Sequence, residues 1–322
     1  MTAPDNVPLR LVIHGGAGAI NRRRLTAERE VAYREVLTQS LTAGYAVLSS
    51  GGSSIDAVIA AIVVLEDSPF FNAGKGSVFN HEGQNELEAS IMEGATRLAG
   101  AVAGISTVRN PIRAAHAIML KSPHAMLIGP GAEKFAAAQG LEIVDPEYFY
   151  TLHRWEQLQK ALANELVLRD HDVDASIPFA NNDEKHGTVG AIALDRRGNL
   201  AAGTSTGGLT NKQRGRVGDS SIIGAGTYAD NRSVAVSATG TGEVFIRAAA
   251  AYQTAAQVKL LQKPINEAAD GTLKEVSSLG GDGGLIVLNA KGDFVMQFNT
   301  SGMFRGTIGN DGMAWTGIFP DD

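Results

Sequence analysis

The sequence predicts an α+β protein in which helices and sheets pack as separate layers. Helical patterns dominate the first half of the chain, and short strands joined by tight turns dominate the second half. A long stretch without any period separates the two halves. Because helices and strands are grouped along the chain, this order favours packed α and β layers over the alternating βαβ units of a doubly wound fold.

The first half is expected to begin with a buried strand, "LRLVIHGGAG", that ends in a glycine turn at residues 15–18. An amphipathic helix should follow over about 27–48. A second helix, over about 55–65, should begin after Ser53 or Ser54 as its cap. The stretch "EDSPFFNAGKGSVFN" is too rich in Gly and Pro for a regular element, and a further helix is expected after Pro111.

The second half is expected to follow a linker and to consist mainly of hairpins. From about Val167 to His186 the charged, irregular sequence indicates an exposed linker. Three hairpins are then expected: "TVGAIALD" with "NLAAGTSTGG", "SSIIGAGTYA" with "SVAVSATG", and "GGLIVLNAKGDFVMQFNT" around its own "AKG" turn. A single helix over about 243–261 should lie between the second and third hairpins.

Composition and charge limit the class of protein. The 322 residues, 44% hydrophobic and 19% charged, are typical of a globular chain that can bury a large core as one or two domains. The net charge of −6 argues against a nucleic-acid partner. The absence of cysteine removes disulfides, thiolate metal sites and a cysteine nucleophile.

The chain also lacks the signals of export and of membrane insertion. Its first residues, "MTAPDNVPLR", do not combine a basic stretch with an apolar core, so no signal peptide is expected. The longest apolar run, residues 57–65, is too short to span a bilayer. We therefore expect a cytoplasmic protein with no membrane partner.

Three common kinds of functional site are not expected, because the sequence motifs that each requires are incomplete. The seven histidines are scattered, without a His pair at i, i+4 spacing beside a Glu, so a catalytic transition metal is not expected. "HGGAGA" completes neither phosphate-binding glycine motif. "GTSTG" matches the nucleophile elbow of a serine hydrolase, but that arrangement needs a later histidine, and His186 is the last one in the chain.

The Gly187–Thr188 pair, at the seam between the linker and the first strand of the second half, offers another nucleophile. A threonine at a chain terminus carries its own base, since its α-amino group has an unperturbed pKa of about 7.7–8.0. Cleavage between Gly187 and Thr188 would create that amino group, and glycine before the bond leaves room for the Thr188 hydroxyl to approach its carbonyl. A Gly-Thr pair at a strand start is also common as a purely structural feature, so both interpretations stay open.

The wider sequence resembles the plant-type L-asparaginase/isoaspartyl aminopeptidase family of N-terminal nucleophile hydrolases. The matching segments, in chain order, are "HGGAG", "LEDSPFFNAGKGSVF", "ELEASIMEG", "AGAVAGI", "RNPIRAA", "HGTVGAIALD", "TSTGGLTNKQRGRVGDSSIIGAGTYA", "TGTGEVFIR" and "FNTSGM". The resemblance implies a single four-layer αββα sandwich over residues 1–322, made as a precursor that cleaves itself before Thr188. It further implies an α subunit of residues 1–187, with a flexible linker at about 167–187, and a β subunit of residues 188–322. Family members commonly form a dimer of such heterodimers.

The resemblance assigns catalytic roles to four residues. Thr188 is similar to the family nucleophile, with its own amino group as base, and Thr206 to the threonine whose hydroxyl hydrogen-bonds that nucleophile. Thr239 and Gly240 correspond to the oxyanion hole, through a hydroxyl and a backbone N–H. His186, beside the cleavage site, is interpreted either as a solvated linker residue or as an aid to cleavage.

It also assigns the residues that bind substrate and sodium. Arg216 and Asp219 resemble the clamp for the substrate's α-carboxylate and α-amino groups, a pairing that suits a guanidinium and a carboxylate. Gly242 matches a position whose carbonyl helps to hold the substrate amine. Asn72 matches a position that borders the nucleophile. No catalytic cofactor is implied. A structural sodium ion is implied, on main-chain carbonyls of Leu65, Glu66, Ser68, Phe71, Ala73 and Lys75.

The activity that follows from the resemblance is hydrolysis of a β-linked aspartyl amide. The expected substrates are L-asparagine and dipeptides that begin with a β-aspartyl residue. Glycosylasparaginase is the alternative within the superfamily, although the missing signal peptide and cysteines count against it. A glycine-rich ligand-binding protein is the remote alternative outside enzymes.

Overall fold

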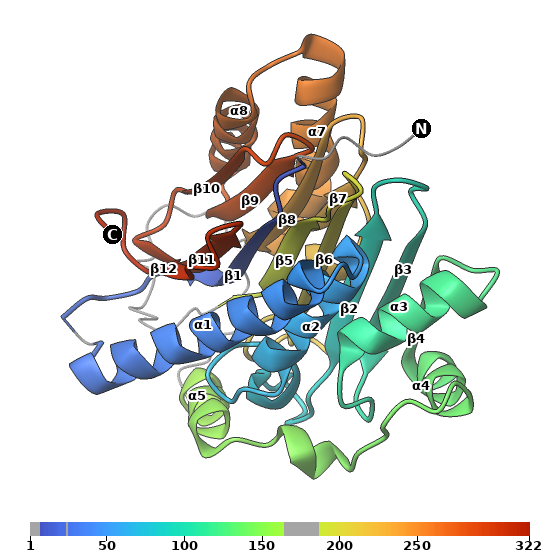
Figure 1. Ribbon diagram of the computed structural model, residues 1–322. Helices are drawn as coiled ribbons and strands as arrows, with labels where there is room; N and C mark the ends of the chain where they lie inside the picture. Colours follow the sequence, from blue (N-terminus) through green and yellow to red (C-terminus); the bar gives the residue numbers. More distant parts are fainter. Residues whose placement is uncertain (1–6, 24, 164–186) are drawn as a thin grey trace.

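The computed structural model describes residues 7–23, 25–163 and 187–322. The expected linker therefore lies outside the described residues, His186 included, except for Gly187 at its end. Two β-sheets, one of eight strands and one of four, are combined with helices (Figure 1). This mixture confirms the α+β class.

The large sheet carries strands from both halves of the chain. Its neighbours are antiparallel, except that β3 and β4 run parallel. In spatial order the strands are β12 (Trp315–Gly317), β11 (Gly302–Gly309), β1 (Arg10–Gly18), β5 (Val189–Leu194), β6 (Leu200–Thr206), β2 (Leu87–Glu93), β3 (Ala99–Ile105) and β4 (Met126–Ile128). The strand that follows Thr188 thus lies at the centre of the sheet, between β1 and β6.

The small sheet is antiparallel and packs face to face on the large one. Its strands, in spatial order, are β10 (Phe294–Phe298), β9 (Gly283–Asn289), β8 (Val234–Gly240) and β7 (Thr227–Ala229). Buried apolar side chains from both sheets fill the space between them, among them Val12, Ile192, Leu194, Ala202, Ala235, Ile286, Leu288 and Met303. Burial of this interface removes apolar surface from water on the inner face of each sheet.

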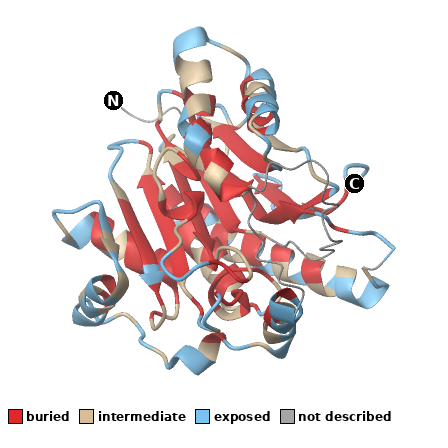
Figure 2. Ribbon diagram, turned by 180° about the vertical axis from the view of Figure 1, so that it is seen from behind, coloured by how far each residue is buried: buried red, intermediate tan, exposed pale blue. Residues whose placement is uncertain are grey.

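Helices cover the outer face of each sheet. Three of them, α1 (Ala27–Ser49), α2 (Ser54–Glu66) and α3 (Pro111–Lys121), pack on the large sheet; α6 (Gly242–Ala248), α7 (Ala250–Leu261) and α8 (Ile265–Ser278) belong to the apolar cluster on the small one. The order of packing is helices, sheet, sheet, helices, and Figure 2 shows mostly buried strands between helices with exposed outer faces.

The remaining helices lie at the periphery of the large sheet. Helix α4 (Gly129–Ala138) packs beside β3 and β4. Helix α5 (Leu152–Ala163) carries the buried Arg154, whose Nε donates to the Gly76 carbonyl at 2.8 Å. None of the helices in the described part of the chain combines the length and apolar character needed to cross a bilayer.

Several local expectations are confirmed. The three hairpins form as β5–β6, β7–β8 and β9–β10. Helices α1 and α2 match the expected ranges closely, and the Ser53 hydroxyl caps α2 by accepting from the Asp56 amide. Pro111 opens α3, as its fixed φ and missing N–H favour.

Other expectations are wrong in detail. The single helix over 243–261 is broken at Ala249, which adopts a left-handed φ of 46° between α6 and α7. Strand β1 does not end in a turn at Gly15 but continues through Gly18, with a register shift between His14 and Gly16. Within "SSIIGAGTYA" only the last three residues form β7, and a 3₁₀ turn, η3 (Asp219–Ser221), precedes them.

The first half is also less helical than expected, because it supplies β1 to β4. Strand β3 contains Gly100, where an added β-carbon would lie 2.0 Å from the Ala115 carbonyl oxygen of α3. Strands this rich in Gly and Ala have low intrinsic β propensity, so tertiary packing against α3 defines them.

Candidate active site

Thr188 lies in the space between the two sheets. It is buried and directly precedes β5, and its Oγ1 is 3.2 Å from the Ser220 hydroxyl of η3. Gly187 faces β8, since an added β-carbon there would lie 2.7 Å from Thr239 Oγ1. The Gly187–Thr188 bond is therefore held between the central strand of the large sheet and a strand of the small one.

The glycine stretch of β1 approaches the same bond from a third direction. Gly16 has φ of 108°, and an added β-carbon would lie 2.5 Å from the Gly187 nitrogen. Beside it, the Ala17 amide donates to Thr239 Oγ1 at 3.3 Å. A side chain at Gly16 would push the two backbones apart, and one at Gly187 would clash with the Thr239 hydroxyl, so the small size of both glycines permits the approach.

Thr239 and Gly240 end β8 next to this point. Thr239 accepts from Ala17, which leaves its own hydroxyl proton for another acceptor. Gly240 has φ of 148°, and an added β-carbon would lie 2.2 Å from the Asp282 carbonyl oxygen. The structure thus places Thr239 beside Gly187, with Gly240 as the next residue of β8.

Thr206 and Asn72 form a second pair at the end of β6. The Thr206 hydroxyl donates to the Asn72 carbonyl at 3.3 Å and accepts from the Gly208 amide at 3.1 Å. The Asn72 side chain donates to the Gly208 carbonyl and accepts from the Val78 amide. The hydroxyl hydrogen-bonded to Thr188 is that of Ser220, so the direct contact between Thr206 and the nucleophile stays a prediction.

Arg216, Asp219 and Gly242 meet on one side of Thr188. An added β-carbon on Gly242 would lie 2.9 Å from Arg216 Nη2 and 3.0 Å from Asp219 Oδ1. Arg216 donates from Nε and Nη2 to the two carboxylate oxygens of Glu243, at 2.8 and 2.9 Å. Its Nη1 lies 4.0 Å from Glu88 Oε1. Burial opposes the charge of Arg216, but the bond to Glu243 and the nearby carboxylates raise its pKa.

The hydrogen-bonding capacity of the Asp219 carboxylate is only partly used. The residue is buried, and its Oδ2 has no hydrogen-bond partner among the described residues. Burial, and then the negative charge of Glu88, raise the pKa of Asp219 to about 7. A buried acceptor of this kind is costly unless it finds a donor, which an ammonium group of a ligand would supply.

Besides Ser220, two contributors to the site, Glu88 and His14, had no role in the sequence-based prediction. Glu88 accepts from the Gly218 amide and from the Ser221 hydroxyl, so it fixes the segment that carries Asp219 and Ser220. His14 is buried, with Nδ1 3.0 Å from the Thr188 carbonyl oxygen. Burial lowers its pKa to about 3, although the bond to Thr188 opposes this shift. Glu88 lies in "ELEAS" and His14 in "HGGAG", two of the segments that resemble the family. The position of neither residue in the sequence indicates a function by itself.

The six residues expected at a sodium site lie at the end of α2 and in the loop after it. This loop turns tightly, since an added β-carbon on Gly74 would lie 2.3 Å from the Glu66 carbonyl oxygen. Its carbonyls lie near the C-terminal end of α2, where the helix dipole favours a cation. Main-chain oxygens suit a hard cation, and the described residues hold no cluster of three or more His, Asp and Glu side chains that could serve instead.

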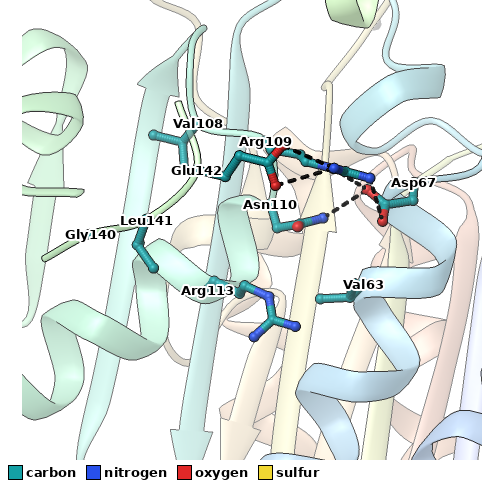
Figure 3. Close-up of a pocket in the computed structure, with 9 residues that line it drawn as sticks. All are labelled: Val63, Asp67, Val108, Arg109, Asn110, Arg113, Gly140, Leu141 and Glu142. Atoms are coloured by element: carbon teal, nitrogen blue, oxygen red, sulfur yellow. Dashed lines mark hydrogen bonds and ion pairs between the residues drawn. The ribbon is translucent and has the colours of Figure 1, made fainter. Parts of the chain in front are cut away.

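A separate pocket of about 450 Å³ opens between the end of α2, the start of α3 and residues 140–142 (Figure 3). Arg109 crosses its rim, with ion pairs to Asp67 and Glu142. None of the residues assigned to the Thr188 site lines this pocket. It is therefore distinct from the candidate active site.

Comparisons with known proteins agree on one family. The asparaginase family model matches residues 7–318. The chain is 50% identical to the isoaspartyl peptidase of Escherichia coli (strain K12) over 296 residues, which cover 92% of this chain and 91% of that protein. It is 41% identical to the isoaspartyl peptidase/L-asparaginase of Homo sapiens over 316 residues, or 98% and 97% of the two chains. The isoaspartyl peptidase of Salmonella typhimurium is 47% identical, over 92% and 93% of the two chains.

The raised pKa of Asp219 predicts a pH-dependent cost to folding. The folded state keeps a proton on Asp219 up to about pH 7, whereas the unfolded chain loses it near 3.8, so this group destabilises the fold as the pH rises through that range. Asp219→Asn has the same shape without the charge. We expect its thermal midpoint to exceed that of the wild type at about pH 8, with a smaller difference at about pH 5.

The matched control is Asp270→Asn, which alters an exposed aspartate on α8 and should produce no pH-dependent difference. Equal thermal midpoints for Asp219→Asn and the wild type at both pH values would contradict the raised pKa of Asp219.

Proposed function

The chain belongs to the asparaginase family, and from this premise we propose that it is an isoaspartyl peptidase and L-asparaginase with Thr188 as its nucleophile. The observation that carries the proposal is the convergence of Gly187, Thr188 and Thr239 between the two sheets. The packing order of helices, sheet, sheet and helices supports the αββα sandwich of N-terminal nucleophile hydrolases.

The first reaction in the proposal is cleavage of the chain by itself. Thr188 Oγ1 attacks the Gly187 carbonyl carbon, and the Gly187–Thr188 amide becomes an ester as the amide nitrogen takes a proton. Water then hydrolyses the ester, which leaves a Gly187 carboxylate and a free Thr188 amino group. The single αββα domain of residues 1–322 thereby becomes an α subunit, 1–187, and a β subunit, 188–322.

The second reaction uses the amino group so created. It accepts the proton of Thr188 Oγ1 as that oxygen attacks the β-carbonyl of the substrate. The Thr239 hydroxyl and the Gly240 N–H stabilise the oxyanion, an interaction whose loss typically lowers the rate by about 100- to 1,000-fold. The amine or ammonia leaves with a proton, and water then releases L-aspartate from Thr188. Thr206 is proposed to orient the nucleophile from the end of β6.

Substrate choice follows from the charges beside Thr188. Glu243 occupies two N–H groups of Arg216, and the remaining N–H groups would bind the substrate's α-carboxylate. Asp219, with its unpartnered Oδ2, would accept from the α-ammonium, aided by the Gly242 carbonyl. Since both α-groups must be free, the aspartyl residue has to be N-terminal. Asn72 would border the nucleophile.

Glycosylasparaginase remains the second candidate, because the same Gly-Thr chemistry would serve it. The names of the relatives favour the isoaspartyl peptidase and L-asparaginase activity. Comparison of kcat/KM for L-asparagine, a β-aspartyl dipeptide and a glycosylated asparagine decides among these substrates. We also propose that two processed units form a dimer of heterodimers, which the native mass from light scattering tests.

Thr188→Ala removes the proposed nucleophile and should leave the chain uncut and inactive. Denaturing gel electrophoresis of the wild type should show two bands, and N-terminal sequencing of the smaller band should begin at Thr188. Thr210→Ala, which alters a threonine with no assigned role, is the control for substitution and should be processed normally. Wild-type hydrolysis by Thr188→Ala would refute the proposal.

Arg216→Gln should be processed but bind substrate weakly. Loss of a charged hydrogen bond to the α-carboxylate is expected to raise KM by roughly 10- to 100-fold. The neighbouring Arg214 is exposed and pairs with Glu82, so Arg214→Gln is the matched control and should keep KM unchanged. An unchanged KM in Arg216→Gln would remove its role in the clamp.

A structural sodium ion is proposed on the carbonyls of the loop after α2. It would stiffen the loop that carries Asn72 and so support the site without taking part in the chemistry. Thermal unfolding in sodium chloride should then occur at a higher temperature than in choline chloride of equal ionic strength. Identical midpoints in the two salts would argue against this site.

A further inference from the structure

Five polar side chains are hydrogen-bonded in series behind Thr188, in the space between the two sheets. Each is completely buried, and they come from five different strands. In the order of the series they are His14 of β1, Ser237 of β8, Thr204 of β6, Thr227 of β7 and Ser90 of β2. Successive atoms are 2.9, 2.7, 2.5 and 2.8 Å apart.

Both ends of the series return to the candidate nucleophile. At one end, His14 Nδ1 lies 3.0 Å from the Thr188 carbonyl oxygen. At the other end, Ser90 Oγ donates to the Ser220 carbonyl at 2.6 Å, and the Ser220 hydroxyl is 3.2 Å from Thr188 Oγ1. With Ser220 and Thr188 included, the series closes into a ring, which we call the hydroxyl ring.

The protons of the hydroxyl ring have a defined direction at the Thr188 end. A carbonyl oxygen can only accept, so Nδ1 of His14 carries the proton and Nε2 accepts from Ser237. Ser237 then accepts from Thr204, which accepts from Thr227. Thr227 accepts from Ser90, whose single hydroxyl proton is shared between Thr227 and the Ser220 carbonyl. Burial keeps the His14 imidazole neutral, which leaves Nε2 free to accept. The donors from Thr227 to His14 are thus aligned toward the Thr188 carbonyl.

The backbone next to Thr188 makes room for the hydroxyl ring. At Gly190 an added β-carbon would lie 2.0 Å from Ser237 Oγ and 2.4 Å from His14 Nε2. The ring atoms thus occupy the space that a side chain would take two residues after the candidate nucleophile. This arrangement is independent of the hydrogen bonds and shows that ring and strand fit together.

We propose that the hydroxyl ring is a positioning device, which sets Thr188 Oγ1 relative to Ser220 and to the oxyanion donors, with Thr204 and Ser237 as positioning residues. This inference rests on the proposed function of Thr188 as the nucleophile. Apolar side chains would fill the same space, but they would not fix the distance and register between strands of two sheets as directional hydrogen bonds do. A misplacement of about 1 Å at a reacting atom can lower a rate by roughly 100-fold.

Thr204→Val tests the inference, because it keeps the shape and removes the central hydroxyl. We expect kcat to fall by roughly 10- to 100-fold while KM stays within about twofold, since Arg216 and Asp219 do not belong to the ring. Thr204→Ser retains the hydroxyl and should restore kcat. The matched control is Thr254→Val, which removes another completely buried hydroxyl, paired with Thr272 between α7 and α8.

A second variant perturbs the hydroxyl ring without removing any hydroxyl. Gly190→Ala would place a methyl group against Ser237 and His14, so kcat should fall here too with little change in KM. Gly131→Ala, where an added β-carbon meets nothing within 4 Å, is its control. If Thr204→Val does not fold, Gly190→Ala and Ser90→Ala take its place, and each should lower kcat while KM stays nearly unchanged.

The outcomes separate this inference from the proposed function. A wild-type chain without a Thr188 N-terminus or without hydrolase activity would refute the proposed function. An active wild type together with a folded Thr204→Val of unchanged kcat would overturn only the role of the ring. Equal losses of kcat in Thr204→Val and Thr254→Val would also overturn that role, since they would reflect stability alone.

Discussion

The close approach of three chain segments at Gly187 is the constraint on which the rest of the site depends. Gly16 must lack a side chain for β1 to reach Gly187, and Gly187 must lack one because Thr239 Oγ1 contacts the same point from the other sheet. Large apolar residues such as Ile192 and Leu288 fill the adjoining space between the two sheets. The inter-sheet core therefore serves the site as well as the stability of the fold.

The charges beside Thr188 form an acidic pocket around one arginine. Arg216 is surrounded by Glu243, Glu88 and Asp219, and of these only Glu243 lies within direct bonding distance of its guanidinium. Carboxyl groups thus outnumber the guanidinium here, and burial, followed by the negative charge of Glu88, raises the pKa of Asp219. A ligand with both an ammonium and a carboxylate would balance this pocket better than an anion alone.

Local signals in the sequence predicted the hairpins, the Ser53 cap of α2 and the start of α3, since each depends on residues close in the chain. The break at Ala249 was missed because alanine favours helix and only tertiary packing imposes its left-handed conformation. Among site residues, Arg216 and Asp219 were identified from the family resemblance of the segment "GRVGDS". Ser220 and the members of the hydroxyl ring could not, because their contacts join strands that lie far apart in the sequence.

The order of strands in the large sheet determines what a cut before Thr188 would leave behind. Strand β1 lies between β11 and β5, and β2 pairs with β6, so strands from the two sides of the cut interleave. Neither fragment would then hold a complete large sheet, although all four strands of the small sheet lie after the cut. Folding of the intact chain is a unimolecular event, whereas reassembly of separated fragments would depend on their concentration. The uncut chain is therefore the natural folding unit, and a cut would make unfolding hard to reverse.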